Sequence, residues 1–198
     1  MIPDQTSPSS SQPALTLVAA SNQGKIMLEG AGAAQILRQA WQTPELAPGA
    51  GAEAGPGQVY RLRSDLFFVH TPPGAQTETA QFLAACGREL ASLLTVTDVT
   101  AGRAEFRLTG PAATRVLGQL CGLDLAPAAF PNLAARFTSL AKTRQLLVRR
   151  DDGGLLSFAI IGPRSLAAYL LETLLVAGRD QGLVLVEPGS VPASRRAL

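Results

Sequence analysis

The sequence predicts an α+β protein made of two β-α-β-β-α-β halves, the ferredoxin-like order, which pack together as one body. A strand followed by a helix near residue 26 recurs near residue 104. Each half also contains an apparent antiparallel hairpin, which excludes a single doubly wound parallel sheet. Helices around Leu83 and Leu170 are apolar on more than one face, so both faces need cover. The expected halves are residues 14–100 and 101–187.

The chain is long enough to bury a core, because 198 residues are 46% hydrophobic and 16% charged. This balance excludes a wholly disordered chain or a charged coiled coil. A net charge of +2 supplies no basic field for nucleic acid. The sequence therefore predicts an ordinary globular protein that binds no nucleic acid.

The first half begins with a strand ending at residues 26–30, followed by a helix that carries Ile36 and Leu37. A hairpin turns at Ser64-Asp65, between strands 59–63 and 66–70. The next helix is expected to carry Phe82, Leu83, Cys86, Leu90 and Leu93, and a strand at 95–99 follows.

The second half repeats this order. Residues 104–109 alternate in polarity like a half-buried strand, and Gly110-Pro111 opens a helix. One long strand at 138–150 turns at residues 151–154 into a second strand at 155–161. A helix bearing Leu166, Leu170, Leu174 and Ala177 follows, and a strand at 184–187 ends the half.

Three stretches lack periodicity and are expected to be mobile. Residues 1–13 and 188–198 are tails, and Pro44–Gly57 is a Gly- and Pro-rich flexible loop. The N-terminus has no basic start with an apolar run, and no stretch of 18 uncharged apolar residues follows. We therefore expect a soluble cytoplasmic protein with no membrane contact.

The residue types that build metal sites and catalytic triads are scarce. Cys86 and Cys121 lie in apolar helical patterns without ligand spacing, so both are interpreted as buried core thiols. His70 is the single histidine and cannot alone form a metal site or a relay. No GxGxxG or GxxxxGK[ST] motif follows a strand. We expect no catalytic residue and no metal in this chain.

Basic residues supply the candidate contact sites. Lys142 and Arg144, on one side of a presumed strand, are candidates for a carboxylate-rich ligand or partner. Arg149 and Arg150 point to opposite faces of a strand, so at most one contacts a given partner; a solvated strand end is the alternative.

Acidic residues and one aromatic have structural alternatives. Asp151-Asp152 is expected to be part of a tight hairpin turn rather than an acid pair. Asp98 is expected to cap a turn or pair with Arg103. Phe130, in a Pro-rich loop, either docks another subunit or anchors an ordinary loop.

Residues 99–113, VTAGRAEFRLTGPAA, resemble the folate-binding aminomethyltransferase superfamily, that of the glycine-cleavage T-protein. The continuation at 120–125, at 127–133 and at 141–150 is similar to the gamma-subunit family of heterotetrameric sarcosine oxidases. The resemblance covers about residues 95–180. The family's usual Ser-His before Gly-Arg is replaced here by Thr100-Ala101, and the Lys-Gly-Cys-Tyr type motif of related iron–sulfur assembly proteins is absent.

The resemblance implies a T-protein-like folate-binding fold and an accessory subunit without catalytic residues of its own. The assembly would oxidatively demethylate sarcosine to glycine, with tetrahydrofolate accepting the one-carbon unit. Flavin and NAD are expected on the larger partner subunits, and tetrahydrofolate is a candidate ligand of this chain. The alternative is a folate-binding or aminomethyltransferase-like protein that acts alone.

Overall fold

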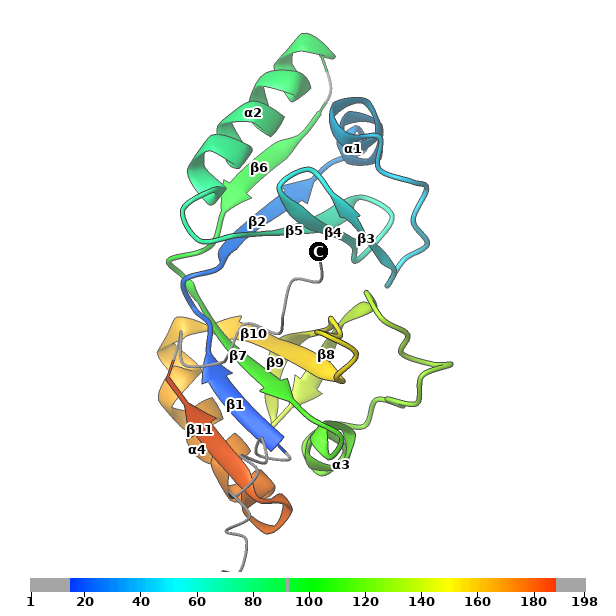
Figure 1. The fold of residues 1–198 in the computed structure, drawn as a ribbon. Coiled ribbons are helices and arrows are strands. Elements are labelled where there is room, and N and C mark those ends of the chain that lie inside the picture. Colours follow the sequence, from blue (N-terminus) through cyan, green and yellow to red (C-terminus); the bar gives the residue numbers. More distant parts are fainter. Residues whose placement is uncertain (1–14, 92, 188–198) are drawn as a thin grey trace, which may run out of the picture.

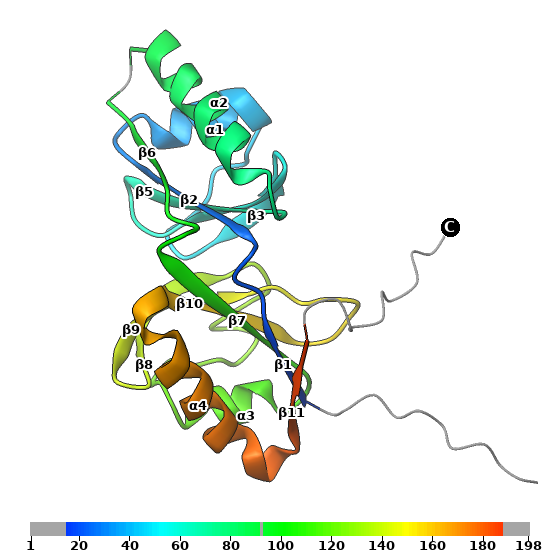
Figure 2. The same ribbon diagram turned by 90° about the vertical axis from the view of Figure 1, so that its left-hand side faces the viewer.

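The computed structural model describes residues 15–91 and 93–187, and the tails expected at 1–13 and 188–198 lie outside these ranges. Within them the chain forms four layers, with two β-sheets facing each other and helices on the outer face of each (Figures 1 and 2). The predicted α+β class is confirmed. No helix among the described residues is long and apolar enough to cross a membrane.

The first sheet has five strands in the order β3-β4-β5-β2-β6, all in antiparallel pairs. Two helices, α1 and α2, cover its outer face (Figure 1). The elements are β2 (Gly24–Glu29), α1 (Ala33–Trp41), β3 (Gly51–Ala54), β4 (Gly57–Arg61), β5 (Leu66–Thr71), α2 (Gln76–Glu89) and β6 (Thr95–Asp98).

The second sheet has six strands in the order β11-β1-β7-β10-β9-β8, and α3 and α4 cover its outer face (Figure 1). Only the pair of β1 and β11 is parallel. The elements are β1 (Leu15–Ala19), β7 (Arg103–Thr109), α3 (Ala113–Gly118), β8 (Ala135–Leu140), β9 (Thr143–Arg149), β10 (Ser157–Pro163), η1 (Arg164–Leu166), α4 (Ala167–Gly178), η2 (Arg179–Gln181) and β11 (Leu183–Val186).

Strand β1 lies in the second sheet, although residue 14 was expected to begin the first half. It separates β7 from β11, and it pairs with both. Leu15 and Leu17 are fully buried and pack with the residues of α4, which explains why this strand joins the sheet of residues 103–186. The first sheet starts only at Gly24.

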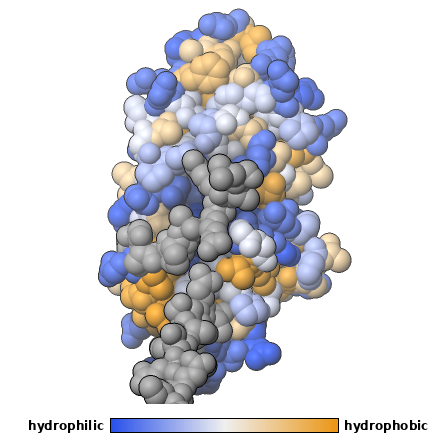
Figure 3. Space-filling view, viewed as in Figure 1, coloured by the Kyte–Doolittle hydropathy of each residue, from blue (hydrophilic) through white to orange (hydrophobic). Residues whose placement is uncertain are grey.

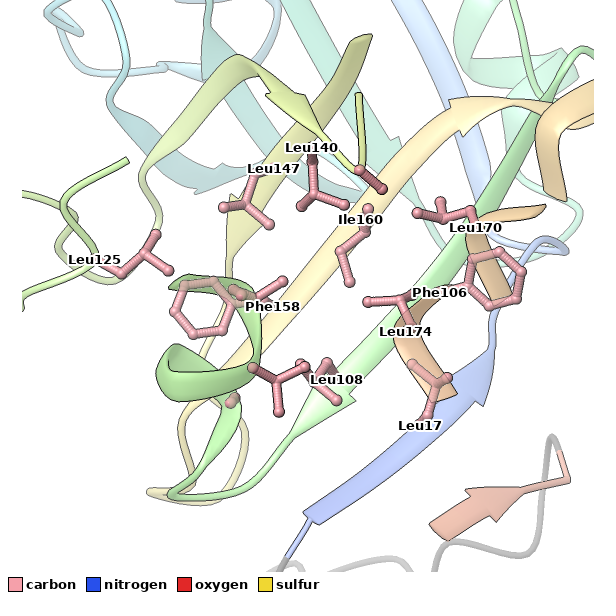
Figure 4. Close-up of a cluster of buried hydrophobic side chains, with 14 of the residues drawn as sticks. Leu17, Phe106, Leu108, Leu125, Leu140, Leu147, Phe158, Ile160, Leu170 and Leu174 are labelled. Atoms are coloured by element: carbon pink, nitrogen blue, oxygen red, sulfur yellow. The ribbon is translucent and has the colours of Figure 1, made fainter. Parts of the chain in front are cut away.

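Three apolar clusters hold the layers together. Under α3 and α4, side chains of β1, β7 and β10 point toward Leu170 and Leu174 (Figure 4). A matching cluster lies between the first sheet and its helices. The third lies between the two sheets and is formed by Tyr60, Phe68, Ala135, Leu146, Val148, Ala159 and Ile161. Both faces of each sheet are therefore covered over much of their area, and burial of this apolar surface is the main stabilising contribution.

The stretch Pro44–Gly57 is not simply a flexible loop, so this expectation was wrong. Gly51–Ala54 forms β3, which pairs with β4, and the side chain of Leu46 is buried. The glycines permit the close approach, because a Cβ on Gly51 would collide with the ring of Tyr60. The Gly- and Pro-rich composition did not indicate β3, because this edge strand has no alternation of apolar and polar residues.

The prediction of one long strand at 138–150 is also wrong, because a tight turn divides this segment into two strands. Ala141 and Lys142 both have positive φ, 51° and 60°, and they connect β8 to β9. This backbone is that of a type I′ hairpin turn, which Asn-Gly usually forms. Neither residue signals such a turn, which explains the missed boundary.

Smaller differences concern helix ends. Helix α3 begins at Ala113, two residues after Pro111, and α2 ends at Glu89, before Leu90 and Leu93. Leu93 is 86% exposed. The viewed face of the molecule mixes hydrophilic and apolar residues, with apolar groups gathered over α1 and α2 and beside α4 (Figure 3).

Candidate functional site

A cleft of about 570 Å³ opens beside the tip of the β3–β4 hairpin. Its walls come from this hairpin, from the end of β5 and the two prolines after it, from Gln23 before β2 and from Arg150 after β9. Most of the wall therefore belongs to the first sheet, and Arg150 belongs to the second. The lining residues are Gln23, Glu53, Ala54, Gly55, Pro56, Gly57, Gln58, Thr71, Pro72, Pro73 and Arg150.

A row of polar residues leads from the cleft into the protein. The strand registers pair Glu53 with Gln58, Gln58 with His70, and His70 with Lys25. The four side chains therefore share the inner face of the first sheet, because directly paired residues of neighbouring strands point to the same side. Gln58 Nε2 donates a 2.7 Å hydrogen bond to Glu53 Oε2 at the cleft end.

At the inner end of the row, Glu105 of β7 joins the two sheets. Its Oε2 lies 2.9 Å from His70 Nε2 and 3.1 Å from Lys25 Nζ, and Glu105 and Lys25 are fully buried. Arg107 Nη2 lies 3.6 Å from Glu105 Oε1. Lys25, His70 and Glu105 form what we call the charge cluster.

The carboxylate and the ammonium of the charge cluster have shifted pKa values. Burial by itself would raise the pKa of Glu105, but the hydrogen bond from His70 and the nearby positive charges outweigh it, so the pKa lies below its ordinary value. Burial lowers the pKa of Lys25, and the attraction of Glu105 opposes this only in part. Lys25 Nζ also donates to the carbonyl oxygens of Gln23, at 2.7 Å, and Ser21, at 3.3 Å.

The walls of the cleft carry no activated nucleophile among their described contacts. The Thr71 hydroxyl donates to the carbonyl oxygen of Pro72 at 3.1 Å, so no base among its contacts activates it. The described residues contain no group of three or more His, Cys, Asp or Glu that could hold a metal ion. The cleft instead offers a carboxylate and an amide, Glu53 and Gln58, and the guanidinium of Arg150.

Of the five predicted contact residues, only Arg150 lines the cleft. Arg149 is buried and has a structural role. Its Nε and Nη2 donate to the two carboxylate oxygens of Asp151 at 3.0 and 2.8 Å, and its Nη1 donates to the carbonyl oxygen of Phe130 at 2.9 Å. The two arginines therefore face different surroundings.

The other three candidates lie away from the cleft. Phe130 is fully buried beside Phe158, with ring centroids 6.2 Å apart, so it anchors its loop in the core. Arg144 is exposed and lies over the Phe137 ring at 4.5 Å. Lys142 lies in the turn after β8 and not on a strand, so it does not share a strand face with Arg144.

The structural interpretations of the remaining polar residues are confirmed in part. Asp98 Oδ1 accepts a hydrogen bond from the amide of Thr100 at 2.9 Å, as expected for a turn cap. Asp152 and Leu155 exchange backbone hydrogen bonds around Gly153-Gly154. Cys86 and Cys121 are free and only partly buried, because each lies at the margin of an apolar cluster.

Sequence reasoning missed the residues that make this site. Glu105 was placed on the solvent side of a half-buried strand, yet the opposite sheet covers that side and buries it completely. The sequence pattern assigns no role to Lys25 or Glu53, and it marks His70 only as a single histidine that cannot alone form a metal site or a relay. A usable signal was that an alternating strand in a two-sheet fold has two buried faces, so a Glu there needs a cation.

These features define a two-sheet α+β domain with a polar cleft at the junction of its sheets. The model for the GCVT N-terminal domain matches residues 46–195, and the chain belongs to this family. It is a homologue of sarcosine oxidase gamma subunits: it is 37% identical to the gamma subunit of Corynebacterium sp. (strain P-1) over 52% of this chain and 48% of that protein.

A second relative is much longer than this chain. Sarcosine oxidase subunit alpha of Rhizobium meliloti (strain 1021) is 28% identical over 81% of this chain, which corresponds to 18% of that protein. The alignments thus cover about half or less of these curated relatives.

Two solved structures share the fold. A chain of the heterotetrameric sarcosine oxidase from Corynebacterium sp. U-96, in complex with pyrrole 2-carboxylate, matches with a TM-score of 0.73 and 27% identity over 89% of this chain and 90% of that chain. The glycine cleavage system aminomethyltransferase T from Bartonella henselae also matches with a TM-score of 0.73. Its sequence identity is 20%, and the match covers 89% of this chain and 48% of that chain. The second match shows the T-protein-like fold alone.

Proposed function

We propose that this chain is an accessory gamma-type subunit of a heterotetrameric sarcosine oxidase and contributes no catalytic residue. The observation that carries the proposal is the match to a chain of such an oxidase over 90% of that chain's length. The 37% identity to a gamma subunit supports the same assignment. The larger subunits would hold the flavin and NAD and oxidise sarcosine to glycine.

The chemistry of the described residues supports an accessory role. The charge cluster is fully enclosed between the sheets, so its groups do not reach a substrate. The polar residues at the cleft surface hydrogen-bond one another or have no base beside them. Apolar surface near α4, together with several exposed arginines, supports docking against partner subunits through an apolar centre and a polar rim.

Co-expression with the larger subunits tests the proposal. A tagged copy of this chain should purify together with them as a flavin-coloured complex that oxidises sarcosine. The proposal fails if the larger subunits assemble and reach full activity without this chain, or if the tagged chain purifies without them. The neighbouring reading frames give an independent check, because genes for flavin- and NAD-type subunits are expected beside this one.

The cleft favours a second candidate function, that of a folate-binding or aminomethyltransferase-like protein that acts alone. A pterin ring presents donors and acceptors that match the carboxylate of Glu53 and the amide of Gln58, and the glutamate tail of folate matches the cation of Arg150. These residues fit such a ligand in type, and tetrahydrofolate, when bound, would accept a one-carbon unit.

Calorimetric titration of the isolated chain with tetrahydrofolate separates the two functions. Micromolar binding that Arg150→Gln weakens about tenfold would support the second function. Arg144→Gln is the matched control, because Arg144 is an exposed arginine outside the cleft. An absence of binding by the isolated chain would favour the accessory role.

We also propose that residues 24–98 and residues 103–186 each form a ferredoxin-like unit, with the boundary between them near residues 100 and 101, and that β1 is added to the second unit. The order β4-β5-β2-β6 in the first sheet supports this. In the second sheet β1 takes the place beside β7 that β11 would otherwise occupy.

A further inference from the structure

The chain crosses between the two sheets twice, and both crossings lie on the same side of the molecule. Residues 20–23 connect β1 to β2, and residues 99–102 connect β6 to β7 (Figure 1). On the opposite side, near β3 and β8, the amide of Ala135 donates a 2.9 Å hydrogen bond to the carbonyl oxygen of Gly49. The crossings therefore have the arrangement of a hinge, with the Ala135–Gly49 bond at its open side.

The charge cluster lies at this hinge and binds parts of both crossings. Lys25 Nζ contacts the carbonyl oxygens of residues in the first crossing. The Ser21 hydroxyl accepts a 3.0 Å hydrogen bond from the amide of Glu105. In the second crossing, the Thr100 hydroxyl accepts a 2.9 Å hydrogen bond from the amide of Lys25. Glu105 comes from one sheet, whereas Lys25 and His70 come from the other.

We propose that Lys25, His70 and Glu105 form an ionic latch at the hinge, which holds the two sheets at one separation and so sets the width of the cleft. Arg150 stands on one sheet, and Glu53 and Gln58 stand on the other, so the distance across the cleft depends on the sheet separation. This role is independent of whether the chain works in an oxidase or alone.

The physical reason for this role is that the hydrogen bonds and ion pairs of the charge cluster depend on the direction and distance between their partners. Apolar side chains between the sheets attract without a preferred direction, so they tolerate small shifts of one sheet over the other. The Glu105 carboxylate is held within 3.1 Å of two donors from the opposite sheet, and it loses both if the sheets separate. A buried charge pair contributes little net stability but makes its separation costly.

Two nearby arginines complete the electrostatic surroundings. Arg107 faces Glu105 from the same strand, and Arg164 of η1 adds a further positive charge near Lys25. Arg164 Nε donates to the carbonyl oxygen of Ala101 at 2.7 Å, so it also binds the second crossing. The carboxylate of Glu105 lies within 3.6 Å of Lys25, His70 and Arg107, and the latch depends on it.

Amide hydrogen exchange of the full-length chain tests the latch. The key variant is Lys25→Met/Glu105→Gln, which removes both charges and so leaves none of this pair buried alone. We expect the amide of Ala135 to exchange about tenfold faster or more than in the wild type, because the open side of the hinge separates without global unfolding. The amides of Leu28 and Ile160, inside the two sheets, should change much less.

A matched control removes an exposed charge. Arg63→Gln breaks the ion pair between Arg63 and Glu29, in which the side chain of Arg63 is 56% exposed and that of Glu29 is 59% exposed. This variant should leave the exchange rate of the Ala135 amide unchanged. Equal acceleration at Ala135, Leu28 and Ile160 in the double variant would overturn the latch, because it would show a loss of global stability only. An unchanged rate at Ala135, or a double variant that does not fold, would overturn it as well.

Discussion

Arg149 shows how one buried side chain organises a loop. Its guanidinium binds Asp151 through two parallel hydrogen bonds and also donates to the carbonyl oxygen of Phe130. The fork geometry suits arginine, because a lysine ammonium makes one point contact in its place. The residue that sequence analysis placed among the ligand contacts therefore holds the Phe130 loop against the β9–β10 turn.

Arg149→Lys should lower the free energy of unfolding by about 1–3 kcal/mol, since the bidentate contact and the carbonyl contact cannot both be kept. Denaturant titration measures this loss. Arg150→Lys is the control, because the Arg150 side chain lines the cleft and should change stability by less than about 0.5 kcal/mol. Equal losses in the two variants would contradict the structural role of Arg149.

Acid should destabilise the protein through Glu105. Its pKa in the folded state lies below the ordinary 4.5, so the unfolded chain binds the proton more readily. The resulting stabilisation is present above about pH 4.5 and disappears as the pH falls through the folded-state pKa. Denaturant titrations between about pH 3 and pH 6 should show this loss in the wild type.

Glu105→Gln is the comparison that assigns the effect. The variant has no carboxyl group at this position, so its stability should fall less steeply over the same pH range. Asp65, whose pKa is lowered by the hydrogen bond from Arg63, is exposed and contributes equally to both proteins. Parallel pH curves for the wild type and the variant would contradict the prediction.

At the scale of elements, the β8–β9 hairpin turns through two residues that suit it poorly. Ala141 and Lys142 both adopt the left-handed backbone region, which costs free energy for residues with a Cβ. The turn persists because β8 and β9 pair along their whole length and Leu140 is buried. Tertiary packing here overrides the local preference of the chain.

Lys142→Gly should therefore raise the free energy of unfolding by about 0.5–1 kcal/mol, because Lys142 is exposed with a φ of 60°, a conformation that glycine adopts without a Cβ penalty. Thermal unfolding followed by circular dichroism measures the gain. The reverse kind of change, Gly153→Ala in the Gly-Gly turn with φ of 57° and 81°, should lower the melting temperature. A destabilised Lys142→Gly variant would show that the turn has another requirement.

How well the elements could be predicted depends on how regular their pattern is. The strand ending near Gly30, the Ser64-Asp65 hairpin and α4 follow apolar periodicity, and all appear near the expected positions. Strand β3 has no apolar alternation, and the Ala141-Lys142 turn has no turn residues, so neither could be predicted from local pattern. The cleft and the charge cluster depend on strand pairing over long sequence separation, which no local pattern records.

For the whole molecule, the position of β1 matters most. This strand carries Leu15 and Leu17 into the core of the second sheet and lies between β7 and β11. Leu17→Asp should therefore destabilise the layer of residues 103–186 by several kcal/mol, because it buries a charge without a cation. Hydrogen exchange should show faster exchange in β7 and β10 than in β2 and β5.

Val18→Asp is the control for this change, because Val18 is only partly buried and points to the other side of the same strand. Its effect should be clearly smaller. If Leu17→Asp instead loosened β2 and β5 first, β1 would contribute to the first sheet and not to the second.

The pairing of β1 with β11 unites the first and last described strands of the chain in parallel. During synthesis on the ribosome, the five-stranded layer has all its strands once Asp98 has emerged, whereas Leu15–Ala19 must wait for Leu183–Val186. Strand β1 can pair with β7 once Thr109 has emerged, but its other edge stays unpaired until β11 has been synthesised. Assembly of the six-stranded layer is therefore a late event, and a nascent chain stalled before residue 183 would leave the edge of β1 open to a wrong neighbour.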